Sequence, residues 1–191
     1  ATDVHFTPGE DAREENSITH ALIQFDLSSI PAGNIVSSAI LTLTESAIVD
    51  RATNERIHRL YRMVQAWTEN GATWNTYDGV NSWQVVGATG VNDREQTDIG
   101  NILLPAYPVS GTVYNITLTA SAVGQWVSGA YANNGMMMQA DMENADRHIL
   151  CSSDHATAAY RPKLVVEYTL PGGGARRLFI PDLGYQTMRG A

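Results

Sequence analysis

The sequence predicts an all-β protein, an antiparallel β-sandwich with one short helix. The main observation is Leu22–Leu43, where two apolar runs alternate with polar residues, a period of two that is typical of strands with one face on a core. Pro31 and Gly33 lie between the runs and predict a turn, because proline fixes φ and glycine tolerates a left-handed φ. Similar runs recur later in the chain between turn-rich segments, a spacing that is typical of sandwiches.

The remaining elements follow in chain order. Further strands are predicted at Asp3–Phe6, Arg56–Gln65, Thr112–Leu118, Gly135–Ala140, Arg147–Ser152 and Tyr160–Tyr168. Thr119 is a candidate N-cap of the short helix, which carries Trp126 on its apolar face and ends at Gly129. Two polar segments, Thr7–Thr19 and Val85–Ile99, are predicted to be loops.

Composition limits the classes of protein to which the chain can belong. Its 191 residues, 43% of them hydrophobic, are enough for one domain with a sizeable core. The net charge of −8 argues against a general nucleic-acid binder, which needs a basic face. No apolar run approaches the length of a membrane span. The single cysteine, Cys151, excludes an internal disulfide framework.

The C-terminal tail differs from the rest of the chain. Residues 1–170 are predicted to form the sandwich, and residues 171–191 a glycine hinge followed by an extended apolar arm. The arm contains five apolar side chains that would be costly to expose: Leu178, Phe179, Ile180, Leu183 and Tyr185. It either folds back on its own domain or docks on another subunit. The hinge favours docking, so we expect other subunits of the same assembly, in a homo-oligomer, as partners.

A candidate glycan-binding group lies between residues 56 and 83. Aromatic rings stack on the C–H faces of sugars when the rings are exposed, and Tyr77 and Trp83 lie in a segment rich in Asn and Gly. Arg56, Arg59 and Arg62 would form one basic edge facing an anionic polysaccharide. The alternatives are that the tryptophans of this segment are core residues and that the arginines pair with neighbouring carboxylates.

Metal-binding patterns are weak. His148, Cys151 and His155 lie within eight residues, which raises the question of a zinc site. On a strand, however, the odd spacing of His148 and Cys151 would place them on opposite faces, with Cys151 in the core. The only cofactor we consider is a structural calcium ion, held by Glu10–Glu15 or Asn92–Asp98.

An ordered set of motifs between Leu22 and Tyr168 resembles the DNRLRE domains. The set comprises Leu22–Gly33, Ser38–Leu43, Trp67-Thr68-Glu69, Ala72–Asn75, Val123, Trp126, Gly129, Asn134-Gly135-Met136, Ser152-Ser153, Arg161–Leu164 and Tyr168. These domains are related to the disaggregatase-type repeats and to a carbohydrate-binding module family that recognises alginate-like polymers. The resemblance implies a jelly-roll sandwich of secreted, cell-surface or phage proteins, without catalytic residues. Thr7–Thr19 departs from the family pattern, and the tail after Leu170 lies outside the resemblance.

Two classes of function follow from these observations. The first is a non-catalytic structural or decoration subunit of a larger surface assembly, on a virion or an extracellular scaffold, anchored by the C-terminal arm. The alternative is a carbohydrate-binding module for an anionic polysaccharide. Both place the protein outside the cell, at the cell surface or on a virion. Neither involves catalysis, because no nucleophile elbow, phosphate-binding loop or dinucleotide motif occurs and no pair of carboxylates stands out.

Overall fold

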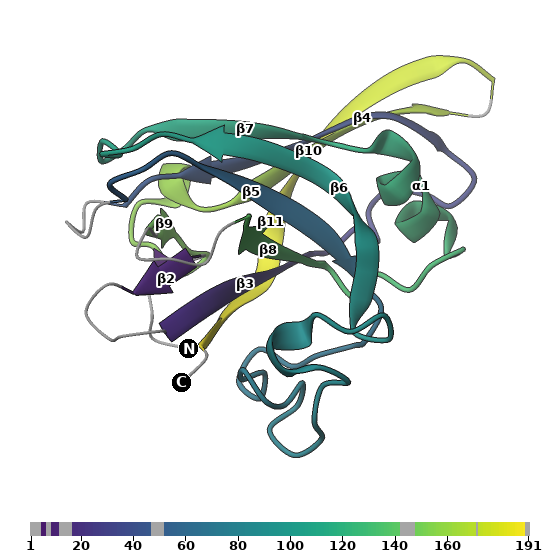
Figure 1. Ribbon diagram of the computed structural model, residues 1–191. Coiled ribbons are helices and arrows are strands. Elements are labelled where there is room, and N and C mark those ends of the chain that lie inside the picture. The colour runs from purple at the N-terminus through teal and green to yellow at the C-terminus, as the bar shows by residue number, and fades with distance from the viewer. Residues whose placement is uncertain are drawn as a thin grey trace.

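The computed structural model describes residues 5–6, 9–11, 17–46, 52–141, 148–170 and 172–189. Most of the strands follow one order, β6-β5-β8-β3-β11-β10-β4-β7, in which neighbours pair antiparallel. This order folds at β11 into two stacked layers (Figure 1). The arrangement confirms the predicted all-β antiparallel sandwich.

Each layer is named after one of its central strands. The β3 sheet contains β6 (Arg94–Leu104), β5 (Arg56–Met63), β8 (Met136–Ala140) and β3 (Ser17–Phe25). The β4 sheet contains β7 (Val113–Leu118), β4 (Ile35–Thr44) and β10 (Lys163–Leu170). The long strand β11 (Gly174–Arg189) belongs to both, because residues 174–181 pair with β10 and residues 182–189 pair with β3.

Several small elements complete the described chain. Strand β1 (His5–Phe6) pairs with β9 (Leu150–Cys151), and β2 (Gly9–Asp11) pairs with β3. The helices are α1 (Ala120–Ser128) and two single 3-10 turns, η1 (Val86–Ala88) and η2 (Ala158–Tyr160).

The strand pairing is nested in the way expected of a jelly roll. Strand β3 pairs with β11, β4 pairs with β10, and β5 pairs with β8, while β6 contacts β7 across the end of the sandwich. Early strands thus pair with late ones, as in a long ribbon folded on itself. Alternation places one side of each strand in the core, as in β7, where Tyr114, Ile116 and Leu118 are buried between exposed neighbours.

The predicted helix is confirmed with one difference at its start. Four side chains of α1 are buried, including Val123 and Trp126, and the helix packs on β4. It ends at Gly129, which has a left-handed φ of 75°, a conformation that glycine adopts without steric cost. Thr119 precedes the helix, but its side chain makes no capping hydrogen bond. In the part of the chain that the structure describes, no helix has the length and hydropathy of a membrane span.

Both predicted loops contain strand residues. Val85–Ile99 includes the start of β6, which was missed because β6 lies at a sheet edge and exposes polar side chains without clean alternation. Thr7–Thr19 includes β2 and the start of β3, and residues 12–16 lie outside the described residues. Of the predicted strand Arg147–Ser152, residue 147 is likewise outside the described residues.

The tail folds back on its own domain, which was the less favoured of the two alternatives. Strand β11 is paired on both sides of the sandwich and cannot serve as an arm that docks on another subunit without leaving its own sheets. The physical reason is that β10 and β3 would otherwise each leave backbone donors and acceptors unpaired. Ile180 is buried and Leu178 half-buried, whereas Phe179 is 61% exposed. The side chains of Leu183 and Tyr185 lie outside the described ones.

Candidate functional site

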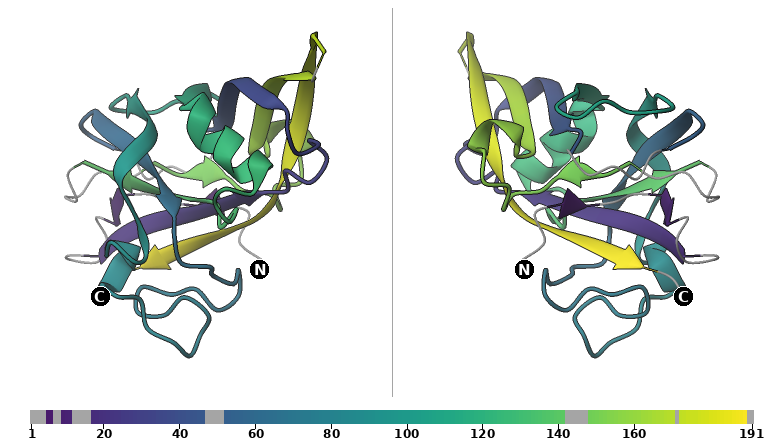
Figure 2. Two further views of the ribbon diagram at one scale, coloured as in Figure 1. Left: turned by 90° about the vertical axis from the view of Figure 1, so that its right-hand side faces the viewer. Right: turned by 90° about the vertical axis from the view of Figure 1, so that its left-hand side faces the viewer.

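Residues 64–93 connect β5 to β6 and pack on the outer face of the β3 sheet, below β3 and β11 in both views of Figure 2. They are named the cover segment. The cluster beneath it is separate from the core between the sheets and contains Leu22, Met63, Ala72, Trp83, Ala88, Met137 and Met188, with Trp67, Trp74 and Tyr77 packed against it. The tryptophans therefore serve to hide an apolar sheet face from water.

Trp83 does not offer the exposed ring that the stacking prediction requires. It is 5% exposed, its ring meets that of Tyr77 at 5.7 Å with an interplanar angle of 63°, and its Nε1–H donates to the Thr73 carbonyl at 2.8 Å. Tyr77 is half-buried in the same packing. The prediction failed because composition cannot distinguish an aromatic-rich binding loop from an aromatic-rich cover.

One buried carboxylate fixes the shape of the cover segment. Asp93 is 2% exposed and accepts backbone N–H groups from Gln84 at 2.8 Å, Val85 at 2.9 Å and Gly90 at 3.0 Å. Such a carboxylate replaces the hydrogen bonds that a regular strand would supply.

The three arginines of β5 do not form one basic edge. Arg62 is 5% exposed, donates to Gln125 of α1 at 2.5 Å and to Glu95 at 2.6 Å, and lies over the ring of Tyr131. Arg59, an odd number of residues away, occupies the other face of the strand. Arg56 is half-buried, and its Nη1 donates to the Glu55 carbonyl. Of the predicted arginine set, Arg59 is the one that reaches the outer face of the β3 sheet.

A row of polar side chains crosses that outer face beside the cover segment. The polar row consists of Arg59 and Tyr61 of β5, Arg94, Asp98 and Asn101 of β6, and Gln139 of β8. Asp98 Oδ2 accepts from Arg59 Nη1 at 3.0 Å and from Asn101 Nδ2 at 3.1 Å. Arg94 places its Cζ 3.5 Å from the centroid of the Tyr61 ring and donates from Nη2 to Gln139 Oε1 at 3.1 Å.

The two ends of the polar row differ in accessibility. The Arg59 and Asp98 side chains are 39% and 24% exposed, and Asn101 is exposed. Arg94 is 7% exposed, so its guanidinium stacks on Tyr61 below the surface and contributes its positive charge to the row. The accessible end therefore presents a guanidinium, a carboxylate and an amide side by side, already fixed to one another.

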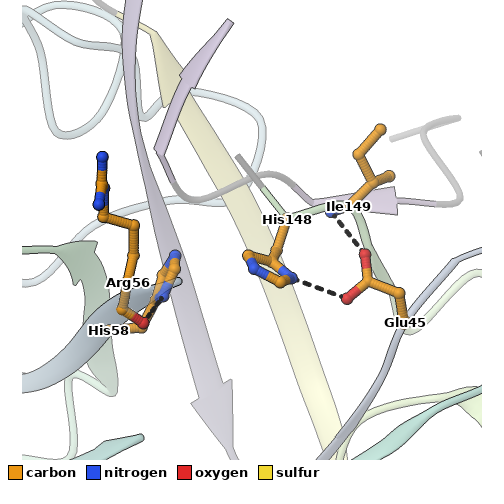
Figure 3. Close-up of polar contacts among 5 residues, drawn as sticks. All are labelled: Glu45, Arg56, His58, His148 and Ile149. Carbon is orange, nitrogen blue, oxygen red and sulfur yellow. Dashed lines mark hydrogen bonds and ion pairs between the residues drawn. The ribbon is translucent and has the colours of Figure 1, made fainter. Parts of the chain in front are cut away.

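A second polar cluster is fully buried near β9 (Figure 3). Glu45 Oε2 lies 2.9 Å from His148 Nδ1, and Glu45 Oε1 accepts the Ile149 N–H at 3.2 Å, so this carboxylate joins the end of β4 to the chain entering β9. Burial and, secondarily, the charge of Glu45 raise the pKa of Cys151 to about 11. The same two causes raise the pKa of the buried Tyr114 hydroxyl.

The buried cluster does not support the zinc pattern. His148 Nδ1 is engaged by Glu45, and Cys151 is 1% exposed and lies among the core residues. His155, the third residue of the pattern, is half-buried, and its Nδ1 accepts from the Thr157 N–H. Across the described ranges, no group of three or more His, Cys, Asp or Glu side chains is placed to hold a metal ion.

The acids of the Asn92–Asp98 calcium candidate are engaged by protein donors. Asp93 binds backbone N–H groups, Glu95 binds Arg62, and Asp98 binds Arg59 and Asn101. Their carboxylates do not converge on one point, as oxygen ligands of calcium must. The other candidate, Glu10–Glu15, falls largely outside the described residues.

Comparison with known families assigns the chain to one of them. The model of the disaggregatase related repeat domain matches residues 9–166, which is most of the chain. The chain belongs to this family. No curated protein matches it. Membership confirms the predicted relation to disaggregatase-type repeats, while the narrower DNRLRE designation stays a prediction. The match of the repeat ends within β10, so β11, the strand that joins the two sheets, lies beyond it.

Most residues of the polar row carry no recognisable pattern in the sequence. Asp98, Asn101 and Arg94 lie in or beside a segment interpreted as a loop, and Gln139 lies in a strand noted only for its methionines. Their proximity follows from register, since Arg59 pairs with Asn101 on one side and Gln139 on the other. An alternating search for polar residues on the outward side of β5 would have found Arg59 and Tyr61, but not their partners.

Proposed function

We propose that this disaggregatase-related repeat is a non-catalytic, surface-type domain that binds an acidic carbohydrate through the accessible end of the polar row. Sugar hydroxyls both donate and accept hydrogen bonds, so neighbouring carboxylate, amide and guanidinium groups suit neighbouring hydroxyls. The proposed function needs no cofactor.

The observation that carries the proposal is the Arg59–Asp98–Asn101 contact. These three side chains are held by hydrogen bonds of 3.0 and 3.1 Å, so little ordering entropy is lost when a ligand replaces water on them. The row as a whole has two guanidinium groups, Arg59 and Arg94, for the single carboxylate of Asp98. In a chain with a net charge of −8, this local excess of positive charge favours an acidic polymer.

The structure does not support the docking arm from which the structural-subunit function was predicted. Strand β11 is instead paired within its own chain. A surface location remains part of the proposal, because polysaccharides accumulate outside cells, at cell surfaces and on the particles that bind them. Partner subunits and an oligomeric state stay predictions.

The proposal is tested by titrating short oligogalacturonates and uncharged dextran oligomers into the full chain by isothermal calorimetry. We expect the acidic sugar to bind more tightly, and Arg59→Ala combined with Asn101→Ala to weaken it by about tenfold, the effect of losing one good charge-assisted hydrogen bond. Asn75→Ala is the matched control, since Asn75 is also an exposed asparagine but lies in the cover segment. Equal binding by the double variant and the control would overturn the assignment of the site.

A further inference from the structure

A concave surface lies on the β4 sheet. It is a hollow of about 370 Å³ lined by Ala158 and Ala159 of η2, Arg161, Lys163 of β10, and Phe179 and Ile180 of β11. The volume falls in the range of small-ligand sites, about 300 to 1,000 Å³. The polar row belongs to the β3 sheet, so the hollow is separate from the site proposed above.

Strand register explains why an aromatic ring and an amine lie together there. Val165 pairs with Phe179, and residues directly opposite in an antiparallel pair share a face. Lys163 precedes Val165 by two residues and therefore points to the same face, diagonal to Phe179. Phe179 is 61% exposed and Lys163 is exposed, so both are open to a ligand.

Three cationic side chains gather around this ring. Arg161 is anchored by its Nε–H, which donates to the His155 carbonyl at 2.8 Å and leaves the two Nη groups for other contacts. Lys163 lines the hollow beside it. Arg177 lies over the Phe179 ring, 5.4 Å from its centroid, and 3.6 Å from Glu167. Among the described side chains named here, three cations accompany one carboxylate, whereas the whole chain has a net charge of −8.

We propose that the hollow binds a sugar unit that carries a carboxylate, with its ring stacked on Phe179 and its carboxylate paired to Lys163 and Arg161. The exposed aromatic ring accounts for the sugar, since apolar C–H groups stack on its negative face. The two cations account for the carboxylate. An acidic peptide would use the cations without using the ring, and a neutral sugar would use the ring without the cations. This second site extends the proposed function and is tested separately from it.

The test uses three probes that separate ring from charge: a trigalacturonate, a triglutamate peptide and a neutral dextran trimer, titrated into the full chain. We expect the trigalacturonate to bind at least tenfold more tightly than either of the others. Phe179→Ala and Lys163→Glu should each weaken it by about tenfold, whereas Arg176→Gln should change it less than twofold. Arg176→Gln is the control, since it removes a positive charge at an exposed position of β11 that does not line the hollow.

Ala159→Trp supplies an independent variant that fills the hollow while keeping every charge. It should weaken trigalacturonate binding as much as Phe179→Ala does, and Phe179 ring resonances should shift on titration of the unaltered chain. Equal affinity for triglutamate or dextran, or no loss in Phe179→Ala and Ala159→Trp, would overturn the inference. A loss of trigalacturonate affinity in the Arg59→Ala and Asn101→Ala double variant, but not in Phe179→Ala, would support the polar row as a binding site and exclude the hollow. Loss in Phe179→Ala but not in the Arg59→Ala and Asn101→Ala double variant would support the hollow and exclude the polar row.

Discussion

The outer faces of the two sheets differ in whether a further segment of the chain covers them. Beside the polar row, the outer face of the β3 sheet is packed under the cover segment with its three tryptophans, whereas on the β4 sheet side chains such as Asn115, Thr117 and Phe179 remain exposed. The segment with the most aromatic residues thus buries one of its three tryptophans, Trp83, to 5% exposure, while a lone phenylalanine in the tail is 61% exposed. In this protein, therefore, aromatic density marks a sheet face that is covered, and the exposed ring that we propose as a binding residue lies where no cover exists.

The outward residues of each sheet account for this difference. Those of the β3 sheet under the cover segment are apolar, Leu22, Met137 and Met188 among them, and would expose a large hydrophobic patch without a cover. On the β4 sheet, Asn115 and Thr117 of β7 and Lys163 of β10 face water directly. An antiparallel sheet can face water on one side when its outer face carries such polar residues, and here apolar side chains such as Val113 and Phe179 are exposed among them.

The largest expected effect comes from deleting β11, the strand that the two sheets share. A chain ending at Leu170 loses the pairing of both β10 and β3 and the buried side chains of Ile180 and Met188. Because domains are stable by only about 5 to 15 kcal/mol, we expect the shortened chain to be unfolded, with a collapsed amide dispersion in two-dimensional NMR. A folded spectrum close to that of the full chain would contradict this and restore the predicted docking arm.

The second-largest loss of stability is expected from Trp83→Ala in the cover segment. Removing this buried ring and its hydrogen bond to Thr73 should lower the free energy of unfolding by about 3 to 5 kcal/mol, measured by urea denaturation. The control is Val113→Ala on the outer face of the β4 sheet, 54% exposed, which should cost less than about 0.5 kcal/mol. A similar small cost for both variants would mean that the cover is not a packed layer, and the comparison of the two faces would fail.

The sequence predicted the central strands and the helix because their apolar residues alternate or share one face. It could not predict β6, because the polar residues of this edge strand do not alternate with apolar ones. Nor could it predict where the tail packs, because the burial of Ile180 beside the exposed Phe179 depends on which sheet edges are free to pair. The polar row was beyond sequence analysis for a similar reason. Register brings Gln139, Arg59 and Asn101 together from positions far apart in the chain.

A smaller effect is expected from Asp93→Asn. The variant keeps one acceptor oxygen but loses the negative charge that holds three backbone N–H groups, so unfolding should become easier by about 2 kcal/mol. Asp78→Asn is the control within the cover segment, because Asp78 also accepts backbone N–H groups, from Val80 and Asn81, but does so in water. Those bonds lower the pKa of Asp78. If the two variants were equally destabilising, burial would not be what makes Asp93 important.

The smallest expected effect on stability is that of Phe179→Ala on the uncovered β4 sheet. At 61% exposure the ring contributes little burial, so the free energy of unfolding should change by less than about 0.5 kcal/mol. The contrast with Trp83→Ala is then complete: the buried ring matters for folding, and the exposed one for binding alone. A loss above about 2 kcal/mol in Phe179→Ala would show that the ring is a structural residue like Trp83. If Phe179→Ala leaves stability unchanged, an exposed aromatic ring beside three cationic side chains has the properties that we expect of a binding residue.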